Sequence, residues 1–207
     1  MAVEISDRAF RSAYSFYWRL QEAFPDYIAN SEAKCPSAWS AAPQFTELVA
    51  LGPKILVPVL EKIALKPEDG QAVSLYNELE KNSEYKVDGN LEHQGIAIVE
   101  KNFTRSRAIR NAILDWAEYC EMVSHASSST AYIGCDEYKN LVSFGAAVIP
   151  QLMLLYNKKE LVSLFAYELF HRILWGYQTG QTTIDMKMQK DMWTEWFEKK
   201  KYDEAPY

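Results

Sequence analysis

The sequence predicts an all-helical protein in which two related helical repeats share one core and a C-terminal amphipathic helix closes the structure. Three observations support this class. A motif recurs at a fixed offset, apolar residues follow helical spacing through most of the chain, and the sole strand-like run, Ile96–Val99, fits a helix equally well. The chain has 207 residues, 48% of them hydrophobic and 24% charged, so we expect a single domain over residues 1–207.

The repeated motif is [Ser/Thr]-Ala-[Trp/Tyr]-x5-[Phe/Tyr]-x2-Leu-Val-x2-Gly. It begins at Ser37 and begins again at Thr130, 93 residues later. Each copy is followed by an apolar, helix-like run, PKILVPVLEKIA or AAVIPQLMLLYN, and then by a helix that carries a Glu-Leu pair. A repeat of this period usually marks stacked supersecondary units. We expect the repeat to relate residues of about 30–82 to about 123–175, with Ser37–Lys62 superposing on Thr130–Leu155.

Further helices are predicted from apolar periodicity. They cover residues 8–23, residues 102–126 and residues 184–199. The last of these is amphipathic, and the side chains expected to pack inward are Met188, Met192, Trp193 and Trp196. The segment Lys86–Gly95 is polar and rich in turn-forming residues, so we place the junction of the two halves there.

Charge and motifs disfavour several classes of function. The net charge is −6, and the basic groups Arg105–Arg110 and Lys199–Lys201 are too short to follow a phosphate backbone, so we expect no nucleic-acid partner. No apolar run reaches the ~18 residues of a membrane span, and no secretory signal is visible, so a cytoplasmic location is expected. The three scattered cysteines are expected to be reduced thiols, with no metal and no cofactor bound. The oligomeric state stays open.

The stretch Leu161–Trp175, LVSLFAYELFHRILW, reads as a helix that is apolar on nearly all sides yet carries polar groups. Those groups are Ser163, Tyr167, Glu168, His171 and Arg172. Its counterpart in the first half, Val73–Lys81, keeps what reads as an ordinary solvated face with Asn77, Glu78, Glu80 and Lys81. The difference predicts that the second helix is covered on more sides. Its polar groups then need partners, and Glu168 can pair with Arg172 at i, i+4.

Three interpretations of this polar cluster stand side by side. It is a satisfied structural network, or the polar lining of a mostly apolar pocket, or a metal site. Glu-x-x-His occurs in di-iron bundles, but those need a second copy that the sequence lacks. In the pocket interpretation, the candidate catalytic residues are Tyr167, Glu168, His171 and Arg172, and the candidate substrate-binding residues are Trp116, Tyr119 and Ser163.

The second repeat resembles a group of uncharacterised fungal proteins. The residues that carry the resemblance are STAYIGCDEYKNLVSFGAAVIPQLM, the later ELFHRILWG and the Trp193–Phe197 region, so that it covers roughly residues 100–200 with a weaker echo in 30–80. The resemblance implies an all-helical fold of HEAT-like helix pairs and a fungal origin. It implies no catalytic residues. Some fungal proteins of this size act in natural-product pathways as cofactor-free cyclases. Extending that activity to this chain is an analogy.

Two functions follow from these observations. In the first, an aromatic-lined helical pocket binds a small hydrophobic molecule, and the protein acts as a cofactor-independent cyclase or isomerase, with a pericyclic step among the reactions that need no nucleophile or metal. A donor such as Tyr167, His171 or Arg172 would polarise a carbonyl, with Glu168 holding His171 or Arg172 in place. The alternative is a non-catalytic helical-repeat module that binds partner proteins.

Overall fold

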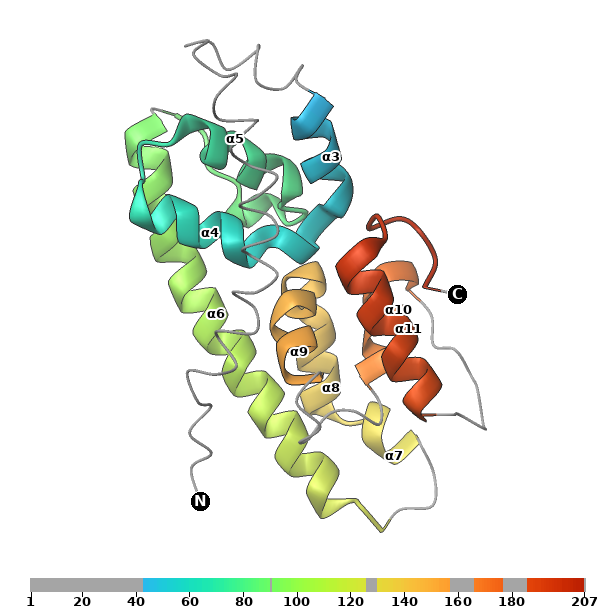
Figure 1. The fold of residues 1–207 in the computed structure, drawn as a ribbon. Coiled ribbons are helices and arrows are strands. Elements are labelled where there is room, and N and C mark those ends of the chain that lie inside the picture. The colour runs from blue at the N-terminus through green and yellow to red at the C-terminus, as the bar shows by residue number, and fades with distance from the viewer. Residues whose placement is uncertain (1–42, 90, 126–129, 157–165, 177–185, 207) are drawn as a thin grey trace. The chain divides into compact units, whose positions relative to one another are not determined.

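A computed structural model describes residues 43–89, 91–125, 130–156, 166–176 and 186–206. Within these ranges the regular structure is helical and no strand occurs (Figure 1), which confirms the predicted all-helical class. The helix predicted over residues 8–23 lies outside the described residues. The contacts divide the chain into two compact units: unit 1 is Met1–Phe103 with Lys201–Glu204, and unit 2 is Thr104–Lys200 with Ala205–Tyr207. The single domain expected over residues 1–207 stays a prediction.

Unit 1 is built from short helices. They are α3 (Pro43–Leu51), the 3₁₀ turn η1 (Gly52–Ile55), α4 (Leu56–Leu65), α5 (Gly70–Leu79), the 3₁₀ turn η2 (Ser83–Tyr85) and the first part of α6 (Leu91–Met122). Helix α4 ends one residue before Lys66, because the proline that follows Lys66 disfavours helical dihedrals there. Helix α5 begins with an N-cap, since the Asp69 carboxylate accepts hydrogen bonds from the N–H groups of Gln71 and Ala72, both at 3.1 Å.

The core of unit 1 lies among α3, α4, α5 and the beginning of α6. Helix α5 packs on both α3 and α4. The side chains of this core are Phe45, Leu48, Ile55, Leu56, Val59, Ile63, Ala72, Val73, Leu75, Tyr76, Leu79 and Ile98. The apolar spacing of the sequence therefore supplies one buried face on each helix, as amphipathic helices require.

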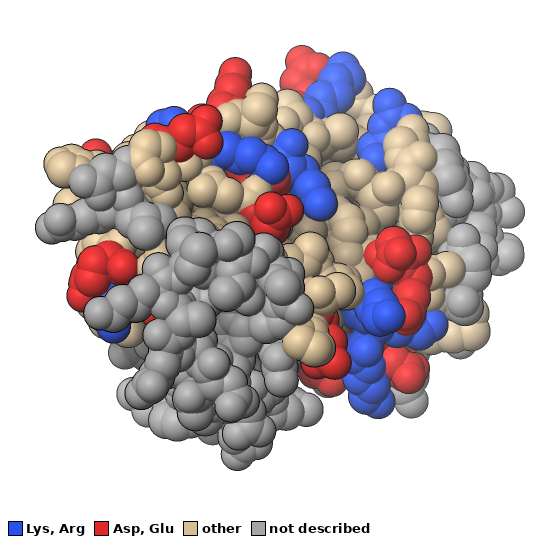
Figure 2. Space-filling view, turned by 90° about the horizontal axis from the view of Figure 1, so that it is seen from above, with Lys and Arg blue, Asp and Glu red and all other residues tan. Residues whose placement is uncertain are grey.

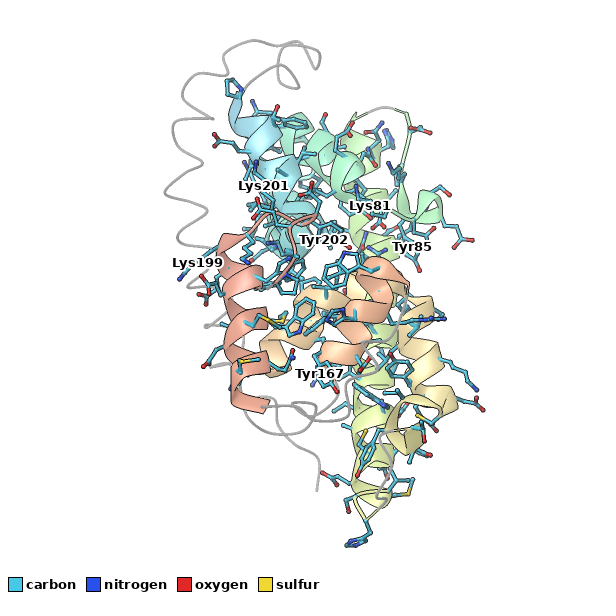
Figure 3. The ribbon with its side chains drawn as sticks, turned by 90° about the vertical axis from the view of Figure 1, so that its right-hand side faces the viewer. Lys81, Tyr85, Tyr167, Lys199, Lys201 and Tyr202 are labelled. Atoms are coloured by element: carbon cyan, nitrogen blue, oxygen red, sulfur yellow. The ribbon has the colours of Figure 1, made fainter. Side chains whose placement is uncertain are left out.

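Residues 201–204 complete unit 1 after the chain has passed through unit 2. The N–H of Tyr202 donates to the carbonyl oxygen of Ala50 at 2.9 Å, and Figure 3 shows Tyr202 on the segment that follows the last helix. Gly52 has a φ of 63°, and a Cβ placed on it would lie 2.6 Å from both Cβ and Cγ of Tyr202. Glycine is thus required at position 52 for its dihedral angle and for the approach of Tyr202.

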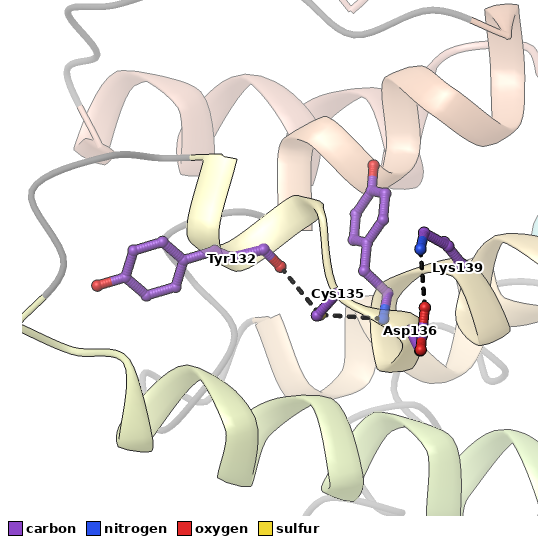
Figure 4. Close-up of polar contacts among 5 residues, drawn as sticks. Tyr132, Cys135, Asp136 and Lys139 are labelled. Carbon is purple, nitrogen blue, oxygen red and sulfur yellow. Dashed lines mark hydrogen bonds and ion pairs between the residues drawn. The ribbon is translucent and has the colours of Figure 1, made fainter.

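Unit 2 contains the rest of α6, α7 (Thr130–Ile133), α8 (Asp136–Ser143), the 3₁₀ turn η3 (Gly145–Ala147), α9 (Val148–Tyr156), α10 (Ala166–Trp175) and α11 (Met186–Lys199). Helix α10 packs on α8, α9 and α11. Helix α8 begins at a sulfur cap: Cys135 Sγ accepts from the N–H of Tyr138 at 3.4 Å and lies 3.5 Å from the carbonyl oxygen of Tyr132 (Figure 4). One turn on, Lys139 pairs with Asp136 at the surface, at 2.7 Å.

The two repeats match in local geometry at the offset that the sequence defines. Gly52 and Gly145 lie 93 residues apart and have φ angles of 63° and 59°. Each glycine opens a 3₁₀ turn that leads into a second helix, and in each unit a third helix packs on the first two. The superposition of Ser37–Lys62 on Thr130–Leu155 stays a prediction, and residues 37–42 lie outside the described residues.

The junction predicted at Lys86–Gly95 is wrong, since α6 begins at Leu91 and the boundary between the units falls inside it, after Phe103. The turn signal came partly from Gly95, which is buried within the helix. A Cβ on Gly95 would overlap the carbonyl oxygen of Pro67, so glycine is present for close packing and not for a turn. The run Ile96–Val99 is helical, and the helix predicted over 102–126 forms the later part of α6, which ends at Met122.

Helix α11 is the helix predicted over residues 184–199. Trp193 and Trp196 are completely buried, as expected, and Met192 is half-buried. The prediction that Met188 packs inward is wrong, because its side chain is 59% exposed. Within the described part of the chain, no helix combines the length and the apolar character needed to cross a membrane.

Candidate functional site

The candidate site lies on α10, which the structure describes from Ala166 onward. Its first six residues are buried, and they include three of the predicted site residues: Tyr167 is 1% exposed, Glu168 4% and His171 4%. The predicted substrate-binding residue Ser163 lies outside the described residues. The expected covering of this helix therefore holds for its first six residues, and α10 is solvated toward its end, where Arg172 and Gly176 are exposed.

Five rings from α10 and α11 form what we call the α10–α11 aromatic cluster: Phe170, His171, Trp175, Trp193 and Trp196. Trp193 contacts the other four, with ring centroids 4.9 Å from Phe170, 5.3 Å from His171, 6.0 Å from Trp175 and 5.4 Å from Trp196. The rings of His171 and Trp193 meet edge to face at 88°, an arrangement that the charge distribution of aromatic rings favours. The imidazole thus lies within an aromatic environment.

Burial sets the protonation states of the polar groups on α10. Burial lowers the pKa of His171, and the nearby charge of Glu168 opposes that shift in part. Burial also raises the pKa of the Tyr167 phenol to about 12, and Glu168 adds to that rise. At neutral pH the imidazole is therefore neutral, with one nitrogen able to donate and one able to accept, and Tyr167 is a hydrogen-bond donor.

Trp193 combines full burial with an unused donor. Its side chain is 0% exposed, and its Nε1 makes no hydrogen bond among the described residues. Buried polar groups almost always find a partner, and one that does not calls for a specific explanation, such as a ligand or a water. The sequence predicted that Trp193 packs inward, but it did not indicate that the indole N–H lacks an acceptor among the described residues.

The covering expected of this helix does not extend to Arg172, and the pairing of Glu168 with Arg172 stays a prediction. Arg172 is exposed, and its Nη1 donates to the carbonyl oxygen of Gly176 at 2.6 Å. Gly176 has a φ of 76°, so it ends the helix in the left-handed region. The arginine therefore hydrogen-bonds the backbone just beyond the C-terminus of α10, where basic residues commonly bind carbonyl groups.

The two remaining candidates lie on α6. Trp116 is completely buried, its Nε1 donates to the carbonyl oxygen of Tyr132 at 2.9 Å, and its ring packs on Tyr138 with centroids 5.6 Å apart. These contacts make Trp116 a satisfied core residue of unit 2. Tyr119 is half-buried. Their role in lining a pocket stays a prediction.

Sequence reasoning missed a buried carboxylate in unit 1. Glu80 was expected on a solvated face, but it is 3% exposed. Its Oε1 accepts from the N–H of Asn82 at 2.9 Å, its Oε2 lies 3.3 Å from the hydroxyl of Tyr76, and Nδ2 of Asn102 donates to that hydroxyl at 2.7 Å. The sequence signal was the i, i+4 spacing of Tyr76 and Glu80, which places the two side chains one helical turn apart on the same side of the chain.

A buried lysine in unit 1 also escaped notice. Lys54 lies in η1 within the apolar run PKILVP and is 1% exposed. Burial lowers its pKa to about 8, and the charge of Glu204 opposes this shift in part. A lysine inside an apolar run was the sequence signal, but the acid that approaches it lies far away in the chain.

No known family model matches this chain, and neither a curated protein nor a solved structure shows significant similarity to it. The resemblance to fungal proteins therefore stays a prediction. Among the described residues, no group of three or more His, Cys, Asp or Glu side chains is placed to hold a metal ion. On the face drawn in Figure 2, acidic and basic side chains lie interspersed. The expectations of no metal and no nucleic-acid partner stay predictions.

Proposed function

We propose that the protein binds a small hydrophobic molecule against the α10–α11 aromatic cluster and acts on it, in the cytoplasm, as a cofactor-independent cyclase or isomerase. The observation that carries the proposal is the indole N–H of Trp193, which is buried in this cluster and makes no hydrogen bond among the described residues. A ligand oxygen is the acceptor that this donor would take. The fungal natural-product setting rests on the sequence resemblance alone.

The chemistry fits a molecule that carries a carbonyl or ether oxygen on an apolar skeleton. Stacked and edge-on rings hold a flexible hydrophobic substrate in one conformer, and such positioning lowers a barrier without a covalent step. The N–H of Trp193 and a neutral His171 are donors that stabilise charge as it develops on the oxygen. Glu168, close enough to shift the pKa of His171, orients the imidazole, and the phenol of Tyr167 stays protonated as a further donor.

A titration with two dyes tests the proposal. Nile red is neutral and carries a carbonyl, whereas anilinonaphthalene sulfonate is an anion, so saturable binding of Nile red in preference to the anion is expected. Trp193→Phe keeps a ring and removes the donor, and it should weaken Nile red binding per folded molecule severalfold, with only the modest loss of thermal stability that a smaller ring brings. The matched control is Tyr76→Phe in unit 1, which loses a satisfied hydrogen bond of a buried network and should lower the melt while leaving binding per folded molecule intact.

His171→Ala separates a site from a purely structural cluster. We expect weaker Nile red binding with a fold that circular dichroism reports as intact. If instead the variant melts much lower yet binds the dye fully per folded molecule, His171 is a core residue, and the proposal that it takes part in ligand binding is wrong. Equal binding by wild type and Trp193→Phe would remove its main support.

The alternative function is a helical-repeat module that binds partner proteins. The observation that favours it is the match of the positive-φ glycines Gly52 and Gly145, each of which opens a 3₁₀ turn before a further helix, since repeated helix pairs commonly form binding surfaces. A protein of this kind should bind neither dye saturably, and substitutions in the aromatic cluster should change only its stability.

A further inference from the structure

We propose that the outer face of α6 is a self-association surface, on which the α6 helices of two copies of this chain pack antiparallel. This inference goes beyond the proposed function and does not depend on it. The outer face is defined by eight exposed residues: Phe103, Arg107, Arg110, Asn111, Leu114, Asp115, Glu118 and Met122. It lies opposite the side of the helix that carries the buried residues Ile98, Asn102, Arg105, Ile109, Ala112, Ile113, Trp116 and Ala117.

Large apolar side chains are unusually exposed on this face. Phe103 is 65% exposed, Met122 69% and Leu114 37%. Single exposed apolar residues are ordinary, but these three share one helix and one face. The sequence positions 103, 107, 110 and 114 are spaced by four, three and four residues, which is the spacing of a helix that packs along a partner helix.

The charges of the helix identify the partner. From Lys101 to Leu114 the helix carries basic residues and no acidic one, and from Asp115 to Met122 it carries acidic residues and no basic one. A parallel copy would set like charges against each other. An antiparallel copy sets the basic half of each helix against the acidic half of the other, so the surface is complementary to itself, as a two-fold symmetric interface requires.

One register satisfies the apolar and the charged residues together. When Arg107 faces Glu118 of a second copy, Arg110 lies level with the second copy's Asp115, and Phe103 lies level with the second copy's Met122. Each of these pairs then occurs twice by symmetry. Exposed ion pairs add little affinity, so their part is to select antiparallel pairing and this register. The apolar pairs at both ends of the contact supply the burial.

Charge exchange provides the test. Arg107→Glu with Arg110→Glu makes the outer face acidic throughout, and Asp115→Arg with Glu118→Arg makes it basic throughout. Wild type should show a mass between that of the 23.8 kDa monomer and its double, rising with concentration, in light scattering behind size exclusion. Each variant alone should be monomeric, with a dimer dissociation constant raised more than about tenfold by like-charge contact. An equimolar mixture of the two should form a dimer again, because opposite charges now meet.

A control variant separates this interface from a general effect of charge. Lys139→Glu with Lys199→Glu changes two exposed lysines on other helices by the same total charge as the acidic variant, and it should dimerise as wild type does. Circular dichroism confirms folding of each variant. Wild type that stays monomeric at all concentrations overturns the proposal, and a cross-link from α6 to residues 1–42 would then assign the face to the chain's own first segment. A dimer that neither variant weakens, or a mixture that does not reassociate, also overturns it.

Discussion

Trp116 and Trp193 are both completely buried in unit 2, but within the described residues Trp116 alone has an acceptor for its indole N–H, at 2.9 Å. The two tryptophans therefore offer a comparison in which ring burial is matched and the hydrogen bond is not. That comparison separates the packing contribution of an indole from its polar contribution.

The first prediction concerns this pair. Trp116→Phe leaves the buried carbonyl oxygen of Tyr132 without its donor and should lower the free energy of unfolding by about 1–3 kcal/mol beyond the loss of ring area. Trp193→Phe removes a donor that has no acceptor among the described residues, so its cost should be confined to packing and smaller. Urea unfolding of both variants measures the difference. A larger loss for Trp193→Phe would mean that its N–H is satisfied in solution.

The second prediction concerns the buried network of unit 1. Tyr76→Phe removes the hydroxyl that accepts from Asn102 and lies 3.3 Å from Glu80 Oε2, and it should cost about 1–3 kcal/mol of unfolding free energy. Tyr76 and Asn102 should be coupled by about 0.5 kcal/mol or more in a double-mutant cycle with Asn102→Ala. Additive effects of the two substitutions would show that the hydrogen bond contributes nothing to stability.

The third prediction concerns pH. The pKa of Lys54 is about 8 in the folded chain and 10.5 as its ordinary value, so between these values the unfolded chain binds a proton that the folded chain does not. Stability contributed by this group therefore rises with pH across that window. Cys120, with its pKa raised from 9.0 to about 11, and Tyr202, with its pKa raised from 10.0 to about 12, add opposite trends above pH 9 and pH 10, so the effect of Lys54 is taken as the difference between wild type and a Lys54 variant from about pH 8 to pH 10.

Lys54→Met should remove the rise. The free energy of unfolding of wild type, followed by denaturant titration at several pH values, should increase relative to that of the variant as pH goes from 8 to 10. Lys139→Met, at an exposed position, is the control and should follow wild type. Parallel pH profiles for wild type and Lys54→Met would show that Lys54 is solvated and titrates normally.

The fourth prediction concerns the two positive-φ glycines. Gly145→Ala should cost about 1–2 kcal/mol for its left-handed dihedral alone, because no atom of the described residues lies within 4 Å of the added Cβ. Gly52→Ala carries the same dihedral cost and also collides with Tyr202, so it should cost more. The excess should vanish in a Tyr202→Gly background, since both Cβ and Cγ of Tyr202 make the contact. Equal costs for the two glycines would place residue 202 elsewhere in solution.

Local patterns in the sequence predicted much of the helical structure. Helical spacing indicated α11 and the later part of α6, and the recurring Gly52 and Gly145 marked the same turn in each repeat, because a positive φ depends on the local chain. The features that the sequence did not reveal depend on distant contacts. Gly95 was predicted to lie in a turn, but it packs against Pro67. Glu80 was predicted to be solvated, but it is buried and lies close to the hydroxyl of Tyr76, which accepts from Asn102.

In the candidate site, too, local sequence predicted some features, and others depend on distant contacts. The order of residues on α10 predicted the burial of Tyr167, Glu168 and His171, since the apolar residues around them leave little solvated surface. The exposure of Arg172 follows from where the helix ends and from the carbonyl of Gly176, which periodicity alone does not locate. The environment of His171 depends on Trp193, which reaches it from a different helix, so it became apparent only with the fold.

The position of Tyr202 against Gly52 has a consequence for synthesis on the ribosome. Domains usually fold in the order in which their residues emerge, so the unit made first is complete first. Unit 1 departs from that order, because it takes Lys201–Glu204 from a stretch translated after all the helices of unit 2. While unit 2 is being translated, the nascent unit 1 therefore lacks Tyr202, and the surface around Gly52 stays uncovered. A chaperone or a protease would contact the surface around Gly52 on the growing chain and not on the finished molecule.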